Sequence, residues 1–272
     1  MIPPQNVSES VYRRAVAQRI GYCNKLIQTT SELHPVRLVV LSCKRPKEFA
    51  RLMESFTKLH PSIRVFCAPL LVDNGSGDAI KQIVEESKFF HHTIYHPVNI
   101  GMGAAINDAL EAHPAEFILF VEDDLVYEAT SFLSPCLSIF QEFPEIGIIK
   151  LKCKDAWDEK PYRRIGPMQT TTTGVRFHPW LPSPRWTFRW GQRPWYPVGI
   201  QNVWSLGPVM FRWVAWKEAG PIPSGQGRGQ AVAAEEVYAR RFNQRWLAAR
   251  PVDIQPFSQP ETPESPGFGD RI

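Results

Sequence analysis

The sequence predicts an α/β protein in which a mostly parallel sheet is flanked by helices. Two observations support this fold class. Short apolar runs rich in β-branched residues alternate with helical stretches through residues 36–125, and three of these runs end in polar side chains. Alternation of this kind is typical of βαβ units. Because the carboxyl ends of parallel strands face the ligand crevice, the polar ends predict a binding site there.

The elements follow one another in a regular order. We expect an N-terminal helix over residues 8–33, and then strands at residues 36–41, 70–72, 93–95 and 117–121. Helices are expected between and before them at residues 47–59, 79–87 and 103–111. Residues 207–219 regain an apolar pattern, residues 233–249 are expected to form a final helix, and the proline-rich tail from residue 251 is expected to be extended or loose.

Composition narrows the class of protein. Hydrophobic residues make up 43% and charged residues 21%, the balance of an ordinary globular chain. The net charge of +4 suits an anionic ligand but is small for a dedicated nucleic-acid binder, so nucleic acid is not an expected partner. The five cysteines lack CxxC spacing, which indicates reduced thiols and a cytoplasmic location. No apolar run approaches the roughly 20 residues of a membrane span.

Three consecutive carboxylates follow the strand expected at residues 117–121. Glu122, Asp123 and Asp124 repel one another unless a cation neutralises them, and Mg²⁺ or Mn²⁺ prefers such oxygen ligands together with substrate phosphates. Side chains alternate along an extended chain, so Glu122 and Asp124 should point one way and Asp123 the other. The cluster could then hold both a metal and a ribose hydroxyl. The alternative to a binding site is a solvated acidic turn or a helix cap without a functional role.

A family resemblance rests on four segments. They are VVLSCKRP at 39–46, LVDNGS at 71–76, NIGMGAAIN at 99–107 and FVEDDL at 120–125. Their order and spacing resemble those of GT-A glycosyltransferases, in particular glycosyltransferase family 2. The EDD form of the acidic motif is similar to that of N-acetylglucosaminyltransferase I-type enzymes. The resemblance covers residues 36–125 well and residues 207–241 loosely.

The resemblance implies roles for residues at the strand ends. Ser42, Arg45 and Asp73 would hold the base and ribose of a nucleotide, and Asn99 and Gly103 would pack beneath it. The resemblance also implies that residues 34–250 form a single GT-A domain. Its nucleotide-binding half would be residues 34–125 and its acceptor half residues 126–250. Residues 1–33 would form a helical extension, and residues 251–272 a proline-rich tail.

The acidic motif receives its roles from the same resemblance. Asp124 would coordinate Mn²⁺ or Mg²⁺, and Asp123 would help to anchor the nucleotide. Glu122 stands where the family usually has aspartate, which leaves its role, metal or ribose, open.

An inverting transfer also needs a carboxylate that deprotonates the acceptor hydroxyl. Residues 234–241, AEEVYARR, are similar to the family's late acidic element, which makes Glu236 the expected base and Glu235 the fallback. Two glutamates in a first helical turn are also favoured by the helix dipole, whatever the function. Arg228 and Arg240 are candidate ligands for the diphosphate, since guanidinium binds phosphate oxygens in pairs. Surface arginines are the ordinary alternative.

Residues 155–204 hold six of the nine tryptophans. They are Trp157, Trp180, Trp186, Trp190, Trp195 and Trp204. Sugar rings stack on aromatic planes, so this segment suits an acceptor site, although any single tryptophan is as well explained by core packing.

Together these patterns predict a metal-dependent inverting glycosyltransferase. It would move a hexose or N-acetylhexosamine from a nucleotide diphosphate sugar, with UDP the first expectation, to an acceptor hydroxyl of a glycan or another compound. Two alternatives stay open, a sugar nucleotidyltransferase and a non-catalytic carbohydrate or nucleic-acid binding module. The first is disfavoured because residues 42–45 contain no glycine.

Overall fold

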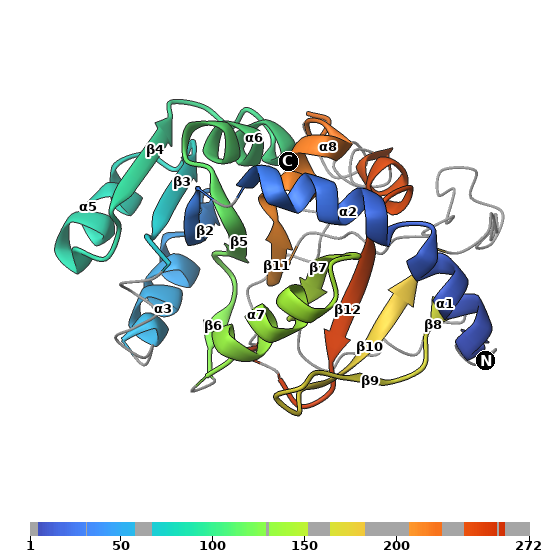
Figure 1. Ribbon diagram of the computed structural model, residues 1–272. Coiled ribbons are helices and arrows are strands. Elements are labelled where there is room, and N and C mark those ends of the chain that lie inside the picture. Colours follow the sequence, from blue (N-terminus) through green and yellow to red (C-terminus); the bar gives the residue numbers. More distant parts are fainter. Residues whose placement is uncertain are drawn as a thin grey trace, which may run out of the picture.

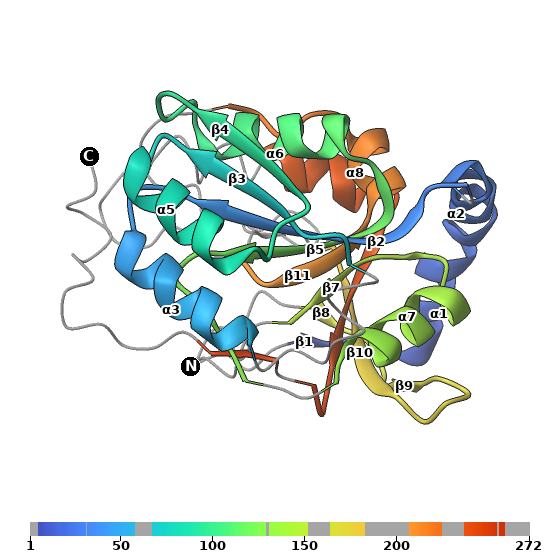
Figure 2. The ribbon, with the colours of Figure 1, turned by 90° about the vertical axis from the view of Figure 1, so that its left-hand side faces the viewer.

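The computed structural model describes residues 5–30, 32–57, 67–128, 131–151, 164–182, 207–224, 237–254 and 256–258. In these residues an eleven-stranded sheet runs through the molecule, with helices on both of its faces (Figures 1 and 2). The order along the sheet is β1-β8-β10-β12-β7-β11-β5-β2-β3-β4, and β9 pairs with β10. The α/β fold expected from the sequence is confirmed.

The first half of the sheet is parallel throughout. Its strands are β2 (His34–Ser42), β3 (Leu70–Asn74), β4 (His92–His96) and β5 (Ala115–Glu122), with β2 between β5 and β3. The connecting helices are α3 (Pro46–Phe56), α5 (Asp78–Ser87) and α6 (Met102–Ala112). Every residue of β2 from Val36 to Ser42 is buried, because helices cover both faces. Burial on both faces is why this strand is a continuous apolar run in the sequence.

The second half mixes directions. Next to β5 lies β11 (Val209–Arg212), which is antiparallel to both of its neighbours, β5 and β7 (Ile146–Lys150). The remaining strands of this sheet are β12 (Leu247–Pro251), β10 (Arg176–Leu181), β8 (Arg164–Ile165), β9 (Gln169–Thr170) and β1 (Gln5–Asn6). Since β7 and β12 run parallel to each other and in the direction of β5, the sheet as a whole is mostly parallel.

Two helical layers enclose the sheet. The core on one face joins residues of α3, α5 and α7 (Leu133–Glu142) to alternate residues of the central strands. The core on the other face joins α6, α8 (Trp213–Ala219) and the helical residues 237–243 to the intervening strand residues. Figure 2 shows α3 and α5 below the sheet and α6 and α8 above it.

The N-terminal segment is two helices, not the single helix expected over residues 8–33. Helix α1 (Glu9–Ala17) ends near Gln18, α2 (Ile20–Ile27) follows after a short break, and the 3₁₀ turn η1 (Gln28–Thr30) leads towards β2. The break lets the two helices contact separate places, the residue before β7 and helix α8. Tyr12 donates a hydrogen bond to Glu145 at 3.1 Å, and Tyr22 donates one to Glu218 at 2.8 Å.

The expectation of a helix over residues 233–249 is wrong at its C-terminal end. Helical structure covers residues 237–243 in the described part of the chain, and Leu247–Pro251 forms strand β12 between β7 and β10. Ala248 and Ala249 favour helix, but the backbone hydrogen bonds to two strands outweigh that preference. Beyond β12, β13 (Phe257–Ser258) pairs with β6 (Val126–Tyr127), so this part of the tail is packed on the domain.

No helix in the described ranges is both long enough and apolar enough to cross a membrane.

Candidate active site

The polar ends of β2, β3 and β5 meet at one edge of the sheet. Ser42 is paired with Asp73 in the β2–β3 register, and Leu41 is paired with Glu122 in the β2–β5 register. The side chains that the sequence pattern singled out at the ends of three strands therefore belong to one cluster. A fourth segment, residues 99–101 before α6, joins it through side-chain hydrogen bonds.

Asp123 is the buried centre of this cluster. Its Oδ2 accepts hydrogen bonds from the Ser42 hydroxyl and from the backbone N–H of Cys43, both at 3.0 Å. Its Oδ1 accepts one from Arg45 Nη1 at 3.1 Å. Burial raises the pKa of Asp123 to about 6, although Arg45 and the two hydrogen bonds to Oδ2 act in the opposite direction. Asp123 thus fixes the β2 end to the β5 end.

Asp124 and Glu122 lie on the more open side. Their side chains are partly exposed, whereas Asp123 is 3% exposed. Residues 123 and 124 form a turn, so the alternation expected for an extended chain does not continue to Asp124. Oδ2 of Asp124 lies 2.9 Å from Nη1 of Arg45, so the guanidinium contacts both aspartates. Burial lowers the pKa of Arg45, but the negative charges of the acids raise it and together prevail. The effect of Asp123 is the largest of the three, followed by those of Asp124 and Glu122. Two of the three carboxylates thus contact one guanidinium, and the charge of the third acts on it as well.

Asp73 closes the turn after β3. Its carboxylate oxygens accept the backbone N–H of Ser76 at 3.2 and 3.3 Å, and the residue is 1% exposed. Burial raises the pKa of Asp73, and the hydrogen bonds from Ser76 lower it. Gly75, between the two, has φ of 85°, and a Cβ there would lie 2.6 Å from the backbone N of Asn99. Glycine therefore allows the turn to approach the next loop closely.

Asn74 connects this turn to the loop before α6. Its Nδ2 donates to Asn99 Oδ1 at 3.0 Å, and its Oδ1 accepts the backbone N–H of Ile100 at 2.9 Å. Asn99 Oδ1 also accepts the N–H of Gly101 at 2.8 Å. The Cys43 thiol donates to the carbonyl of Asn74 at 3.2 Å. These contacts hold the four segments in one arrangement, and sequence reasoning missed Cys43 as a member of it.

Gly103 and Asn107 tie α6 to the segment after α8. A Cβ on Gly103 would lie 2.4 Å from the carbonyl oxygen of Pro223, so this packing by itself accounts for a glycine. Asn107 Nδ2 donates to the carbonyl of Ile222 at 2.8 Å, and its Oδ1 accepts the N–H of Ile222 at 2.9 Å and Trp216 Nε1 at 3.2 Å. Sequence reasoning missed Asn107. Its position among apolar neighbours in α6 is the signal that could have found it.

Several expected site residues lie outside the described residues. They are Arg228, Glu235 and Glu236, together with five of the six tryptophans between residues 155 and 204. Trp180 is described and is 5% exposed in the core on the α6 side of the sheet, which fits a packing role. Arg240 is exposed on the helical residues 237–243.

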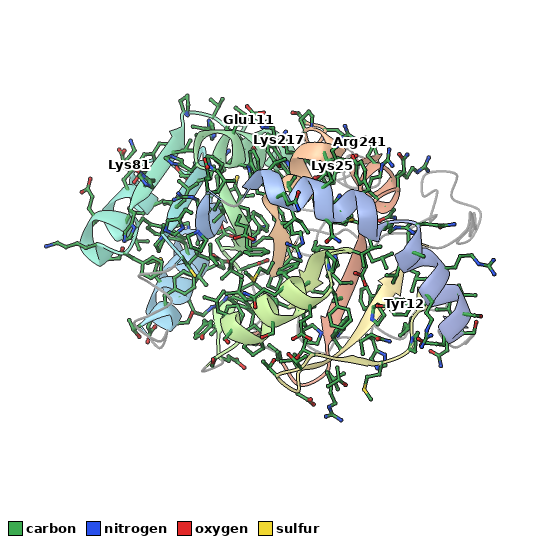
Figure 3. All side chains as sticks on the ribbon, viewed as in Figure 1. Tyr12, Lys25, Lys81, Glu111, Lys217 and Arg241 are labelled. Atoms are coloured by element: carbon green, nitrogen blue, oxygen red, sulfur yellow. The ribbon has the colours of Figure 1, made fainter. Side chains whose placement is uncertain are left out.

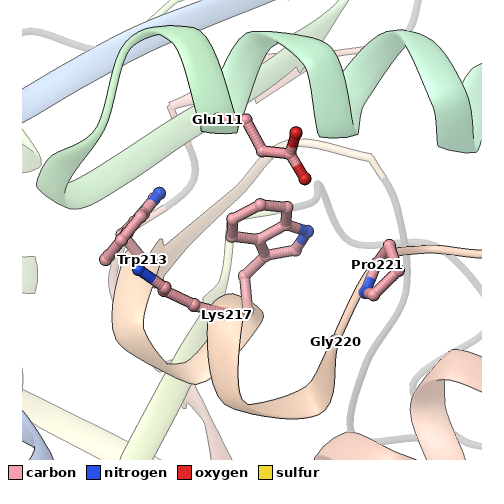
Figure 4. A pocket seen from close by; sticks show the side chains of 6 residues that line it. Glu111, Trp213, Lys217, Gly220 and Pro221 are labelled. Atoms are coloured by element: carbon pink, nitrogen blue, oxygen red, sulfur yellow. The ribbon is translucent and has the colours of Figure 1, made fainter.

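A pocket of about 330 Å³ opens elsewhere, between α6 and α8 (Figure 4). It is lined by Glu111, Trp213, Trp216, Lys217, Gly220 and Pro221. Figure 3 labels Glu111 and Lys217 on the side of the molecule where α6 and α8 lie. Glu111 is in the last turn of α6, whereas the polar strand ends adjoin the first turn of that helix. Trp213 Nε1 donates to the Leu110 carbonyl at 2.8 Å, and the Lys217 ammonium lies 4.6 Å from the Trp213 ring centre. The pocket is separate from the carboxylate cluster.

The sequence was compared with families of known proteins and with curated proteins. The glycosyl transferase family 2 model matches residues 38–196, which include every strand end of the cluster. A comparison with curated proteins gave no match.

Similar solved structures include three of TarS from S. aureus. Residues 1–349 of TarS match with a TM-score of 0.53 and 18% identity, over 82% of this chain and 60% of that one. The same part of TarS in complex with UDP-GlcNAc gives 0.54 and 17%, over 84% and 60%. A further TarS structure gives 0.53 and 17%, over 85% and 37%. This chain thus spans at most 60% of the TarS chains it matches. At these identities the likeness concerns the fold, and it confirms the expected GT-A arrangement.

Proposed function

Because this chain belongs to glycosyl transferase family 2, we propose that it transfers a sugar from a nucleoside diphosphate sugar to an acceptor hydroxyl, with a divalent cation and with inversion. The observation that carries the proposal is the convergence of Asp73, Asp123 and Asp124 at one edge of the sheet. This edge offers hydrogen-bonding groups for a nucleoside next to carboxylates that suit a cation.

The donor set fits Mn²⁺ or Mg²⁺. The Asp124 side chain is 20% exposed and already holds a cation, the guanidinium of Arg45, against Oδ2. In the described ranges no three His, Cys, Asp or Glu side chains surround one metal position. A cation held chiefly by Asp124 would complete its shell with diphosphate oxygens and water, as Mg²⁺ commonly does. When bound, it would neutralise the diphosphate that leaves the sugar. Glu122 is a second candidate ligand or a partner of the ribose.

The buried groups would serve the nucleoside end. Ser42 and Asp73 lie side by side in the β2–β3 register, and Asp123 holds Ser42 in place. Asn99 adjoins them through Asn74, and Gly103 keeps the first turn of α6 close to Pro223. We propose that this rigid edge orients base and ribose, which leaves the diphosphate near Asp124.

UDP sugars are the first donors to test, since TarS, which shares the fold, has been solved with UDP-GlcNAc. Release of UDP from a UDP sugar in Mn²⁺ is the measurement that tests the proposal. The proposal expects slow hydrolysis without an acceptor and a clear rate increase with the right one. Binding of a nucleotide sugar with neither hydrolysis nor transfer would identify a binding module instead. Release of pyrophosphate from a nucleoside triphosphate and a sugar phosphate would identify a nucleotidyltransferase.

The base is proposed to be Glu236, with Glu235 as the fallback, and Arg228 and Arg240 are proposed to contact the diphosphate. Glu236→Gln should lower turnover by about 10²–10⁴-fold with donor binding preserved. Glu235→Gln is the matched control, since it removes the same charge one residue away. If both variants keep near-normal turnover, this segment does not supply the base. A larger defect at Glu235 would move the base to that residue.

A further inference from the structure

Arg45 contacts two of the three carboxylates that follow β5. Its Nη1 lies 3.1 Å from Asp123 Oδ1 and 2.9 Å from Asp124 Oδ2, and its side chain is 27% exposed. The two aspartates differ in their surroundings. Asp123 is 4% exposed at its side chain and also accepts hydrogen bonds from Ser42 and Cys43, whereas Asp124 is 20% exposed. A cation from solution therefore reaches Asp124 more easily than Asp123.

The charge balance sets up a competition. A guanidinium and a divalent cation repel each other, and both are attracted to the Asp124 carboxylate. The Arg45 guanidinium lies 2.9 Å from Asp124 Oδ2, so a metal ion ligated by this carboxylate would lie close to a like charge. In the absence of ligand, Arg45 neutralises part of the negative charge that the three carboxylates create.

We propose that Arg45 is a positioning residue that competes with the divalent cation for Asp124, so that metal binding favours release of its guanidinium. This inference rests on the proposed function, since it assumes that Asp124 is the metal ligand. Once released, the guanidinium can donate to the oxygens of a nucleoside diphosphate. Binding of the metal and of the diphosphate then becomes cooperative, because each favours the same release of Arg45.

The direct test is binding of Mn²⁺ alone to the wild-type protein and to Arg45→Gln, measured by the electron paramagnetic resonance signal of free Mn²⁺. Removal of the competing charge should tighten Mn²⁺ binding by about threefold to tenfold. Lys44→Gln is the matched control, since it removes the same charge at the neighbouring exposed position, where no ion pair to Asp124 is formed in the described structure. It should change Mn²⁺ binding by less than about twofold.

The second arm measures Mn²⁺ binding with saturating UDP. UDP should tighten Mn²⁺ binding more in the wild-type protein than in Arg45→Gln, because the variant has no guanidinium to transfer. Arg45→Lys, which keeps the charge and loses the planar fork, should bind Mn²⁺ alone about as weakly as the wild type. Thermal melts of each variant establish that the protein used is folded.

The outcomes separate this inference from the function on which it rests. If Arg45→Gln binds Mn²⁺ as weakly as the wild type or more weakly, Arg45 prepares the site instead of competing, and the inference is overturned while the function stands. Equal tightening in Lys44→Gln would assign the effect to general charge and would also overturn it. Absence of Mn²⁺ binding in every protein, with and without UDP, would overturn both the inference and the metal-dependent function.

Discussion

Asn107→Ala should destabilise the protein, because it removes the hydrogen bonds that hold the segment after α8 against α6. This segment leads towards residues 225–236. In the wild-type structure this one side chain makes three hydrogen bonds, two to the backbone of Ile222 and one to Trp216 Nε1. Ile222 is 2% exposed and Trp216 is 3% exposed. Alanine would leave two donors and one carbonyl oxygen of these residues without their partner in a buried place.

The magnitude follows from these contacts. A buried polar group left without a partner costs about 1–3 kcal/mol, and a water in the vacated space would recover part of the loss. Three such groups, partly rehydrated, predict a loss of about 2–4 kcal/mol. For a domain of this size, each kcal/mol lowers Tm by about 2–4 °C, so a decrease of roughly 4–16 °C is expected.

Urea denaturation and thermal melts would measure the effect. Asp108→Ala is the control on the next position of α6, where the side chain is 51% exposed and lies 3.7 Å from His96. That change should stay within about 0.5 kcal/mol. If Asn107→Ala is no more destabilising than Asp108→Ala, the three hydrogen bonds do not hold this segment, and the reasoning fails.

Two further predictions concern packing and pH. Tyr12→Phe removes the hydrogen bond to Glu145 and should cost about 1.5–3 kcal/mol at pH 7. Burial raises the pKa of Glu145, and the hydrogen bond from Tyr12 opposes that rise. Without this bond, Glu145 in the folded variant keeps its proton to higher pH. The loss of stability should therefore be smaller at pH 5 than at pH 7. A cost that does not change with pH would contradict this account of Glu145. Gly103→Ala places a Cβ 2.4 Å from the Pro223 carbonyl and should cost about 1–3 kcal/mol. In contrast, a Cβ on Gly21 would have no atom within 4 Å, so Gly21→Ala should increase stability by about 0.5–1 kcal/mol. Equal effects of the two changes on stability would refute the packing argument.

The parallel first half of the sheet could be predicted because its strands are local signals. The apolar runs that became β2, β3 and β5 are buried on both faces, and each ends in polar residues that lie at the same edge. Because the carboxyl ends of parallel strands face one crevice, Ser42, Asp73 and Glu122 could be expected at one site.

The parts that the sequence did not predict depend on distant partners. Residues 247–249 favour helix by composition, and pairing with β7 and β10, from other parts of the chain, makes them part of a strand. The apolar neighbours of Asn107 in α6 indicate that it is buried, but its partner Ile222 is 115 residues away and could not be identified from the sequence. The hydrogen bonds that make Asp123 the buried centre and leave Asp124 more open come from β2, about 80 residues earlier.

The central claim is that Asp124 supports nucleoside diphosphate binding through a divalent cation, and calorimetric titration of UDP with and without Mn²⁺ tests it most directly. In the wild-type protein Mn²⁺ should tighten UDP binding by about tenfold or more, which corresponds to about 1.4 kcal/mol or more. Asp124→Asn keeps the shape of the side chain and should lose most of that gain while the protein stays folded. Asp78→Asn, at a carboxylate that is 99% exposed in α5, should keep the whole gain. An Asp124→Asn protein that binds UDP in Mn²⁺ as tightly as the wild type would contradict the account.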